Sequence, residues 1–247
     1  MITAIIQARV GSTRLPNKIF EELSGKPLLG HICERIAMST KIRQIVIATT
    51  ENPGDDIVET WASGQNIPVY RGSENDVLAR FYHAATKFNA SVIVRITADD
   101  PFKDPEIIDK VIEQLESDAL DFAYNNKPPS FPEGLDTEVF TYKALSKAQT
   151  LSKEPYEREH VTQFFYRHPE QFRQGNLRNE TDLSSLRWTI DTLPDLEMAR
   201  RVYNELYPVK GVFLMNDILD LLKRNPEIAL MNASVRRSDM YNHLNPA

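Results

Sequence analysis

Short apolar runs alternate with amphipathic helical segments through the first half of the chain. The apolar runs cover residues 2–6, 44–49, 67–70 and 91–96. The segments between and after them carry apolar side chains at helical spacing, at residues 27–38, 55–63, 75–88 and 105–115. Strands buried on both faces of a parallel sheet read as unbroken apolar runs, and helices cover the sheet between them. The alternation predicts an α/β fold with a mostly parallel sheet and helices on both faces.

A basic loop follows the first apolar run. Its cations are Arg9, Arg14 and Lys18, and a Gly-Ser-Thr sequence at 11–13 lies among them. Open α/β sheets bind ligands at the carboxyl ends of their strands. Glycine lets a phosphate approach the backbone closely, and arginine and lysine supply forked donors and a point charge. The loop therefore predicts triphosphate binding, with a solvated basic loop as the alternative. It contains neither a Walker A motif nor a G-x-G-x-x-G motif.

Acidic residues follow two predicted strands. Asp99 and Asp100 follow the fourth apolar run, and Asp191 follows a further predicted strand at 186–190. Parallel strands bring their carboxyl ends to one edge of a sheet, so we expect Asp99 and Asp191 to share a cleft with the basic loop, their carboxylates within roughly 4–8 Å. Carboxylate oxygens suit Mg²⁺, which is often shared with substrate phosphates. A turn before the next helix is the alternative, although Asp104 is the better helix cap.

The pattern changes after residue 120. Residues 125–134 contain three prolines and predict an extended loop. A strand is predicted at 137–140, and helices at 143–151, 157–168, 195–206 and 215–224. Asp195 lies in the first turn of one of these helices, where the helix dipole stabilises an acid. We treat residues 1–247 as a single domain with an inserted segment at about 125–180 and a tail at 233–247, which is a covering arm or a frayed end.

The composition argues against several classes of protein. The net charge is −6 and the pI is about 5.5, which disfavours a broad nucleic-acid-binding face. No apolar stretch approaches the roughly 20 residues that span a membrane, and no signal peptide is evident at the N-terminus. The single cysteine, Cys33, excludes an internal disulfide framework and a Cys-based zinc cluster. We therefore expect a cytoplasmic protein without a nucleic-acid or membrane partner.

The basic loop resembles the N-terminal signature of the cytidylyltransferases that activate acidic sugars, which include the CMP-Kdo and CMP-sialic acid synthetases. That pattern, A-R-x-x-S-[TK]-R-x-P-x-K, is filled here by Ala8, Arg9, Ser12, Thr13, Arg14, Pro16 and Lys18. The sequence of the loop is most similar to that of the spore-coat polysaccharide branch, whose members begin with a similar Q-A-R-x-G-S-T-R-L-P. The segment at 97–101 is similar to a family G-D-x-P motif, with Ala98 in place of glycine, and the segment from Asp191 is similar to a family D-x-x-x-D-L stretch.

The resemblance implies a Rossmann-like nucleotidyltransferase fold and a homodimer formed through the inserted dimerisation and acceptor segment. It implies transfer of CMP from CTP to an acidic sugar or related acceptor, with release of pyrophosphate, in surface polysaccharide or glycan biosynthesis. Arg14 and Lys18 would be catalytic, and Asp99 and Asp191 would bind Mg²⁺. Nucleotide contacts are expected from Ala8, Arg9, Gly11, Ser12, Thr13, Arg71, Ser73 and Asp76. Acceptor contacts are expected from Glu133, Asp136, Glu138, Arg158 and His160.

Three alternative functions share parts of this pattern. A nucleotidyltransferase that uses another NTP or a sugar 1-phosphate would need the same loop, and a panel of nucleotides separates it. A metal-dependent glycosyltransferase usually carries Asp-x-Asp, which the adjacent Asp99 and Asp100 do not form. A nucleotide-binding regulator would keep the loop and release no pyrophosphate.

Overall fold

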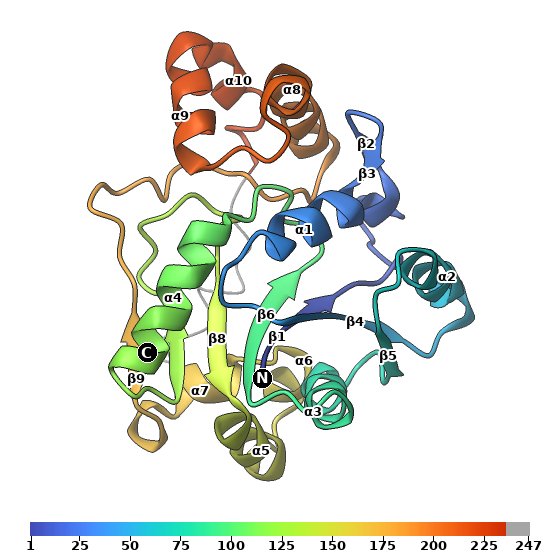
Figure 1. Ribbon diagram of the computed structural model, residues 1–247, viewed down its shortest axis with the longest axis vertical. Coiled ribbons are helices and arrows are strands. Elements are labelled where there is room, and N and C mark those ends of the chain that lie inside the picture. Colours follow the sequence, from blue (N-terminus) through green and yellow to red (C-terminus); the bar gives the residue numbers. More distant parts are fainter. Residues whose placement is uncertain (236–247) are drawn as a thin grey trace.

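A seven-stranded sheet forms the centre of the computed structural model, which describes residues 1–235, so Arg236 and Arg237 of the predicted tail lie outside the described residues. The strand order is β5-β4-β1-β6-β8-β7-β9 (Figure 1). The parallel part consists of β1 (Ile2–Gln7), β4 (Gln44–Thr50), β5 (Val69–Gly72) and β6 (Val92–Thr97). The α/β fold and the mostly parallel sheet are confirmed.

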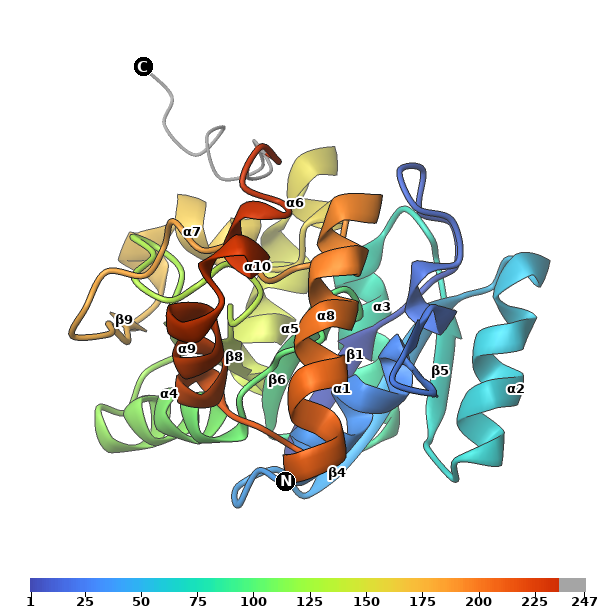
Figure 2. The ribbon, with the colours of Figure 1, turned by 90° about the horizontal axis from the view of Figure 1, so that it is seen from above.

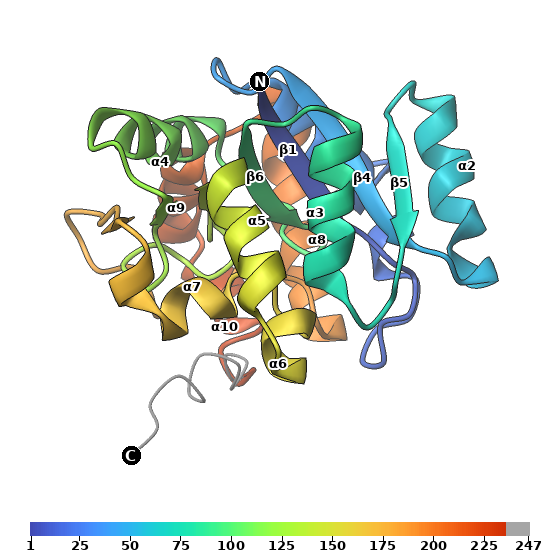
Figure 3. The same cartoon turned by 90° about the horizontal axis from the view of Figure 1, so that it is seen from below.

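Helices cover both faces of this sheet, as Figures 2 and 3 show from opposite sides. One face carries α1 (Leu28–Ala37), α2 (Asp56–Gly64) and α4 (Pro105–Ser117), and the other carries α3 (Val77–Lys87) and α5 (Tyr142–Leu151). Along β1, Ala4 and Ile6 belong to the core on the α1 side, whereas Ile5 belongs to the core on the α3 side. Successive strand side chains point to opposite faces, so a strand buried on both faces must be apolar throughout.

The inserted segment extends the same sheet. Strand β8 (Glu138–Thr141) pairs antiparallel with β6 and with β7 (Phe122–Tyr124), and β9 (Gln174–Asn176) pairs in parallel with β7. Neither β7 nor β9 was predicted, because three residues are too few to show a period. Strands β7 and β8 place the residues between them, 125–137, at the edge of the sheet that the basic loop also reaches.

Two sequence predictions in this half were wrong. The predicted helix at 157–168 is two short helices, α6 (Pro155–Glu159) and α7 (Gln163–Arg167), because His160 has extended backbone angles. The predicted strand at 186–190 is not a strand and makes only an isolated bridge between Arg187 and Glu133. Its alternating apolar residues are explained by burial of Trp188 and Ile190 in the core on the α1 side.

The last helices cover the α1 side of the molecule (Figure 2). They are α8 (Leu193–Lys210), α9 (Met215–Arg224) and α10 (Pro226–Leu230). The small hairpin of β2 (Glu22–Leu23) and β3 (Lys26–Pro27) packs against α8. Short 3-10 helices occur at Lys18–Phe20, Pro53–Asp55 and Pro169–Gln171. Within residues 1–235, none of the helices combines the length and the apolar character that crossing a membrane requires.

Candidate active site

The backbone of the basic loop, residues 8–19, is held by its own hydrogen bonds. The carbonyl oxygen of Val10 accepts from the backbone N–H of Ser12 at 2.8 Å and from that of Asn17 at 3.1 Å. The N–H of Val10 donates to Asp55 Oδ1 at 2.8 Å, which ties the loop to the start of α2. The loop that follows β1 therefore has a defined shape before any ligand arrives.

Two arginine side chains of the loop are open to solvent. The exposed fractions of the Arg9 and Arg14 side chains are 44% and 53%. A Cβ atom added at Gly11 would meet no atom of residues 1–235 within 4 Å, and Gly11 has no positive φ. Packing in the described part of the chain gives no reason for glycine at this position, which agrees with a ligand approaching the backbone there.

Lys18 joins the basic loop to the two predicted metal ligands. Its Nζ atom donates to Asp99 Oδ2 and Asp191 Oδ1, both at 3.0 Å. It also donates to the carbonyl oxygen of Ile190 at 2.7 Å. The two carboxylate oxygens therefore lie within about 6 Å of each other, although 92 positions separate the residues. Their predicted meeting with Lys18 is confirmed, and their role as metal ligands stays a prediction.

The charges of this cluster stabilise one another. Burial by itself would lower the pKa of Lys18, but the carboxylates of Asp99 and Asp191 outweigh it and raise the pKa above its ordinary value. Burial would raise the pKa of Asp191, but nearby cations, first Lys18 and then Arg14, outweigh it and lower the pKa. Arg14 Nη2 lies 2.9 Å from Asp191 Oδ1. Lys18 is therefore charged at neutral pH, and so is Asp191.

A deeper cluster, the Arg187 network, lies behind Asp191. It comprises Arg187, Glu133, Asp191, Asp195 and Asn232. Arg187 donates to Glu133 Oε2 at 2.9 Å and to Asp191 Oδ2 at 3.0 Å. Its Nε donates to Asp195 Oδ1 at 2.9 Å, and Asn232 Nδ2 donates to the same oxygen at 2.9 Å. One buried guanidinium thus fixes three carboxylates, and Asp191 presents its other oxygen to Lys18.

Asp195 does more than stabilise a helix end. It forms a capping box with Thr192 at the start of α8, and its Oδ2 also accepts from the backbone N–H of Asp191 at 3.1 Å. Burial would raise its pKa, but the hydrogen bonds from Arg187 and Asn232 outweigh burial and lower it. The sequence interpretation as a first-turn acid is therefore incomplete, because the principal partner of Asp195 is a buried arginine.

Gly134 lets the 133–135 segment approach residues 187–189 closely. Its φ is +104°, and a Cβ atom there would lie 2.8 Å from the backbone nitrogen of Thr189. Beside it, the N–H of Trp188 donates to the carbonyl oxygen of Glu133 at 2.7 Å. A larger residue would push the two segments apart and separate Glu133 from Arg187.

Two cavities meet at Asp99 and Asp191, which we call the acidic pair. The loop cavity, about 280 Å³, lies in front of the basic loop. It is lined by residues that include Gln7, Arg9, Gly11, Ser12, Thr13, Arg14, Lys18, Asp99 and Asp191. The acidic cavity, about 160 Å³, lies on the β8 side. Arg14, Thr97, Asp99 and Asp191 line both cavities, so a ligand in each would meet at these residues.

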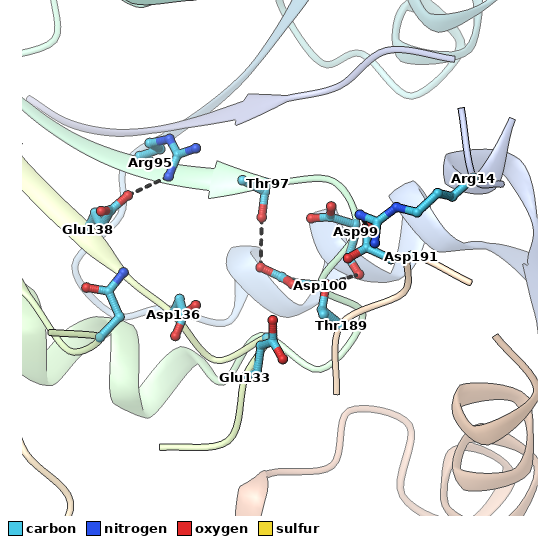
Figure 4. A pocket seen from close by; sticks show the side chains of 12 residues that line it. Arg14, Arg95, Thr97, Asp99, Asp100, Glu133, Asp136, Glu138, Thr189 and Asp191 are labelled. Atoms are coloured by element: carbon cyan, nitrogen blue, oxygen red, sulfur yellow. Dashed lines mark hydrogen bonds and ion pairs between the residues drawn. The ribbon is translucent and has the colours of Figure 1, made fainter. Parts of the chain in front are cut away.

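The acidic cavity is surrounded by carboxylates (Figure 4). Its lining includes Arg14, Arg95, Asp99, Asp100, Asn126, Glu133, Asp136, Glu138 and Asp191. Figure 4 shows Arg14, Asp99 and Asp191 together at one end and the ion pair of Arg95 and Glu138 at the other. Three of the five predicted acceptor residues, Glu133, Asp136 and Glu138, therefore line one cavity beside the acidic pair.

Other predicted site residues do not line these cavities. Ala8 is buried beneath the loop. Arg71 is held by Asp56 Oδ1 at 2.7 Å and by Glu59 Oε2 at 3.0 Å. These ion pairs tie the end of β5 to α2, and they give Arg71 a structural role.

A second group of predicted residues acts at the start of α3. Asp76 caps that helix, and Ser73 Oγ accepts from the N–H of Asp76 at 3.0 Å. Arg158 Nε donates to Asp76 Oδ2 at 3.0 Å, which joins α6 to α3. His160 follows α6 and lines neither cavity. Burial lowers its pKa, and the positive charge of Arg95 lowers it further. The N-cap of α3 is therefore Asp76, and Ser73 supports the turn that precedes the helix.

The sequence analysis missed two charged residues of the site. Arg95 lines the acidic cavity from the middle of β6, and Arg187 organises the network. An arginine inside an otherwise apolar strand is unusual, because charged residues are rarely buried unless they are paired. That signal was available for Arg95. The same signal was available for Arg187 in the predicted strand at 186–190, whereas its partner Glu133, 54 positions away, could not be anticipated.

The oxygen atoms around Lys18 Nζ are of the kind that a hard cation binds. They are two carboxylate oxygens and the carbonyl oxygen of Ile190. Within the part of the chain that the structure describes, no group of three or more His, Cys, Asp or Glu residues is placed to hold a metal ion. Mg²⁺ commonly binds through one or two carboxylates and completes its shell with water and substrate phosphates. Asp99 and Asp191 fit an ion that arrives with a phosphate ligand.

Comparisons with known proteins agree with one another. The family described as cytidylyltransferase matches residues 3–207. Uncharacterized protein MJ1063 of Methanocaldococcus jannaschii is 39% identical over 242 residues, which are 96% of each chain. Spore coat polysaccharide biosynthesis protein SpsF of Bacillus subtilis is 35% identical over 237 residues, 92% of this chain and 96% of SpsF. The structure of a cytidylyltransferase from Leptospira borgpetersenii superposes with a TM-score of 0.88 at 34% identity, covering 92% of this chain and 96% of that one.

Proposed function

The chain belongs to the cytidylyltransferase family, and from this premise we propose that it transfers CMP from CTP to a hydroxyl of a small acidic sugar or related acceptor. Pyrophosphate would be released, and the product would serve surface polysaccharide or glycan biosynthesis. The observation that carries the proposal is the junction of the loop cavity and the acidic cavity at Arg14, Asp99 and Asp191. Such a junction suits a reaction in which an acceptor attacks a bound nucleotide.

The residues of the loop cavity would bind the nucleotide. Arg9 and the backbone amides around Gly11 and Ser12 would hold the phosphates, and Arg14 and Lys18 would neutralise the β- and γ-phosphates. An acceptor oxygen would bond to the α-phosphorus as the bond from that phosphorus to pyrophosphate breaks. Such transfers depend mainly on positioning and on stabilisation of developing charge. Arg14 lines both cavities and its side chain is about half exposed, so its guanidinium would be within reach of either ligand.

We also propose Mg²⁺ as the cofactor, held by Asp99 and Asp191. A bound Mg²⁺ would neutralise phosphate charge and orient the triphosphate. The carboxylate of Asp191 is suited to this role, because Arg187 fixes one of its oxygens while the other faces the cleft.

The acceptor would occupy the acidic cavity. Glu133, Asp136 and Glu138 could accept hydrogen bonds from sugar hydroxyls, and a carboxylate on the acceptor would be attracted by Arg14 and Arg95. These groups form a short polar cavity whose size suits a sugar ring and not a large macromolecule.

The test is pyrophosphate release with CTP and Mg²⁺ across a panel of acidic sugars and sugar 1-phosphates. We expect release with CTP and at least one acidic sugar, and none from the Asp99→Asn variant. Release with a sugar 1-phosphate and UTP or GTP, but not with CTP, would overturn the proposal in favour of another nucleotidyltransferase.

Base preference is tested separately, by measuring the shift in melting temperature that CTP, UTP, GTP or ATP causes, each with Mg²⁺. We expect the largest stabilisation from CTP, because the loop is similar to cytidylyltransferase loops. A larger stabilisation by UTP or GTP would contradict this expectation. The homodimer through residues 125–180 stays a prediction, to be checked by light scattering, and so does the cytoplasmic location.

A further inference from the structure

The ammonium group of Lys18 uses all of its hydrogen-bonding capacity inside the acidic pair. An ammonium has three N–H donors and no acceptor. Its partners are Asp99 Oδ2, Asp191 Oδ1 and the carbonyl oxygen of Ile190, at 3.0, 3.0 and 2.7 Å. The Lys18 side chain is only 11% exposed. Lys18 therefore cannot donate to a phosphate in this arrangement without leaving at least one of these oxygens.

The position between these two carboxylate oxygens cannot hold an ammonium and a divalent ion together. Mg²⁺ binds oxygen at about 2.0–2.1 Å, whereas Lys18 Nζ holds both carboxylate oxygens at 3.0 Å. Placing the ion beside the ammonium would also bring like charges close together in a half-buried site. Entry of the ion therefore requires Lys18 to move out and the carboxylates to move inward.

We infer that Lys18 is an exchangeable cation, which occupies the position between Asp99 and Asp191 in the free protein and leaves it for the phosphates when a divalent ion enters. This inference rests on the proposed metal-binding role of the two aspartates. Lys18 also lines the loop cavity, so the phosphates expected there could receive its ammonium. Metal and nucleotide binding would then be coupled, because each favours the departure of Lys18 from the carboxylates.

Asp191 can exchange its partner at one of its two oxygens while the other stays bound. Its Oδ2 is held by Arg187 at 3.0 Å, and its Oδ1 faces both Lys18 and Arg14. Arg187 is almost completely buried and keeps its partners. Only the outer oxygen of Asp191 therefore has to change partner, which keeps the rearrangement local.

The inference is tested by binding of Mn²⁺ alone, without nucleotide, measured from the electron paramagnetic resonance signal of free Mn²⁺. Wild-type protein should bind Mn²⁺ only weakly at this site. The Lys18→Met variant should bind one equivalent at least about tenfold more tightly, because a charged competitor for two carboxylates is gone. Adding Asp99→Asn to Lys18→Met should abolish the gain.

Lys41 provides a matched control. Its Nζ, in the connection between α1 and β4, also lies between two carboxylates of α4, at 2.9 Å from Glu116 and 3.7 Å from Glu113, and none of the three residues lines either cavity. The Lys41→Met variant should leave Mn²⁺ binding at its wild-type value. If Lys41→Met gains as much affinity as Lys18→Met, the effect is general electrostatics and the inference is wrong.

Folding of the variants is checked by circular dichroism, and Lys18→Gln provides a second neutral variant whose amide can still donate to the carboxylates. If neither Lys18 variant gains Mn²⁺ affinity, or if wild-type protein binds Mn²⁺ as tightly as they do, Lys18 is not an exchangeable cation. The experiment needs no turnover. Inactivity with CTP would therefore contradict the proposed function and leave this result standing.

Discussion

The basic loop and the Arg187 network lie on opposite sides of Asp191 and hold their charges in different ways. Arg9 in the loop is 44% exposed and contacts one exposed carboxylate, that of Glu74, at 2.9 Å. Arg187 is 6% exposed and contacts three carboxylates. Exposed ion pairs contribute little to stability, whereas breaking a buried pair leaves a costly unpaired charge. The exposed loop charges of Arg9 and Arg14 can therefore be redirected to a ligand, and the network charges maintain the shape of the site.

Asp191 belongs to both regions. One of its oxygens is held by the network and the other faces the loop cations. The comparison therefore makes a specific claim: substitutions in the network should lower the stability of the protein, and substitutions in the loop should lower its affinity for the nucleotide.

The largest expected effect is on stability, from Asp195→Ala. Asp195 is completely buried and accepts hydrogen bonds from Arg187, Asn232 and Thr192. Its removal leaves the Arg187 charge partly unpaired, so we expect the free energy of unfolding to fall by about 3–5 kcal/mol. Urea unfolding followed by circular dichroism measures this change.

Asp217 is the matched control, because it occupies the equivalent position in the first turn of α9. It caps that helix by accepting from the N–H of Leu214 at 2.8 Å, but its ion pair with Lys210 is exposed. We expect Asp217→Ala to cost about 1 kcal/mol. Equal losses for the two variants would mean that Asp195 is only a helix cap and that the network is not a separate feature.

The next effect is on affinity, from Lys18→Ala and Arg14→Ala. Both charges are assigned to the leaving phosphates, so each variant should weaken CTP binding by about ten- to a hundredfold and CMP binding much less. Isothermal calorimetry with both nucleotides measures the difference. Arg71→Ala is the control, since its guanidinium is occupied by Asp56 and Glu59. Equal losses for CTP and CMP would contradict the assignment.

The parallel half of the fold could be predicted because its strands are long enough to show a pattern. Strands β1, β4 and β6 are mostly apolar, as burial on both faces favours. Strands β7 and β9 have three residues each, and their positions depend on partners elsewhere in the chain. Local sequence could not reveal them.

The candidate site likewise has one part that local sequence predicts and one part that it does not. The basic loop is contiguous, and the meeting of Asp99 with Asp191 was predicted although the reason given for Asp191, a strand at 186–190, was wrong. The network as a whole could not be predicted, because Glu133 and Asn232 come from segments without a regular pattern and reach Arg187 only through tertiary contacts.

A smaller effect is expected in the pH dependence of stability. The folded-state pKa of Asp195 is lowered, so its stabilising contribution is complete above the unfolded-state pKa near 3.8 and is lost as the pH falls through the folded value. Wild-type stability should therefore decline below about pH 4 more steeply than that of Asp195→Asn, which has no carboxylate to protonate at this position. Urea unfolding between pH 7 and pH 3 compares the two. Parallel profiles would show that protonation of Asp195 is not linked to unfolding.

The smallest effect is expected from Glu74→Gln, which removes the exposed carboxylate that contacts Arg9 in the basic loop. The Glu74 side chain is 40% exposed, so neutralising it should change the free energy of unfolding by less than about 1 kcal/mol. Arg9 would lose its competing carboxylate, so CTP binding should tighten by about two- to fivefold, and the gain should shrink at high salt. Glu205→Gln, which breaks the similarly exposed pair with Arg201 on α8, should not change CTP binding. Weaker CTP binding by Glu74→Gln would mean that Glu74 positions Arg9 for the nucleotide, and the loop would then resemble the Arg187 network more than the comparison allows.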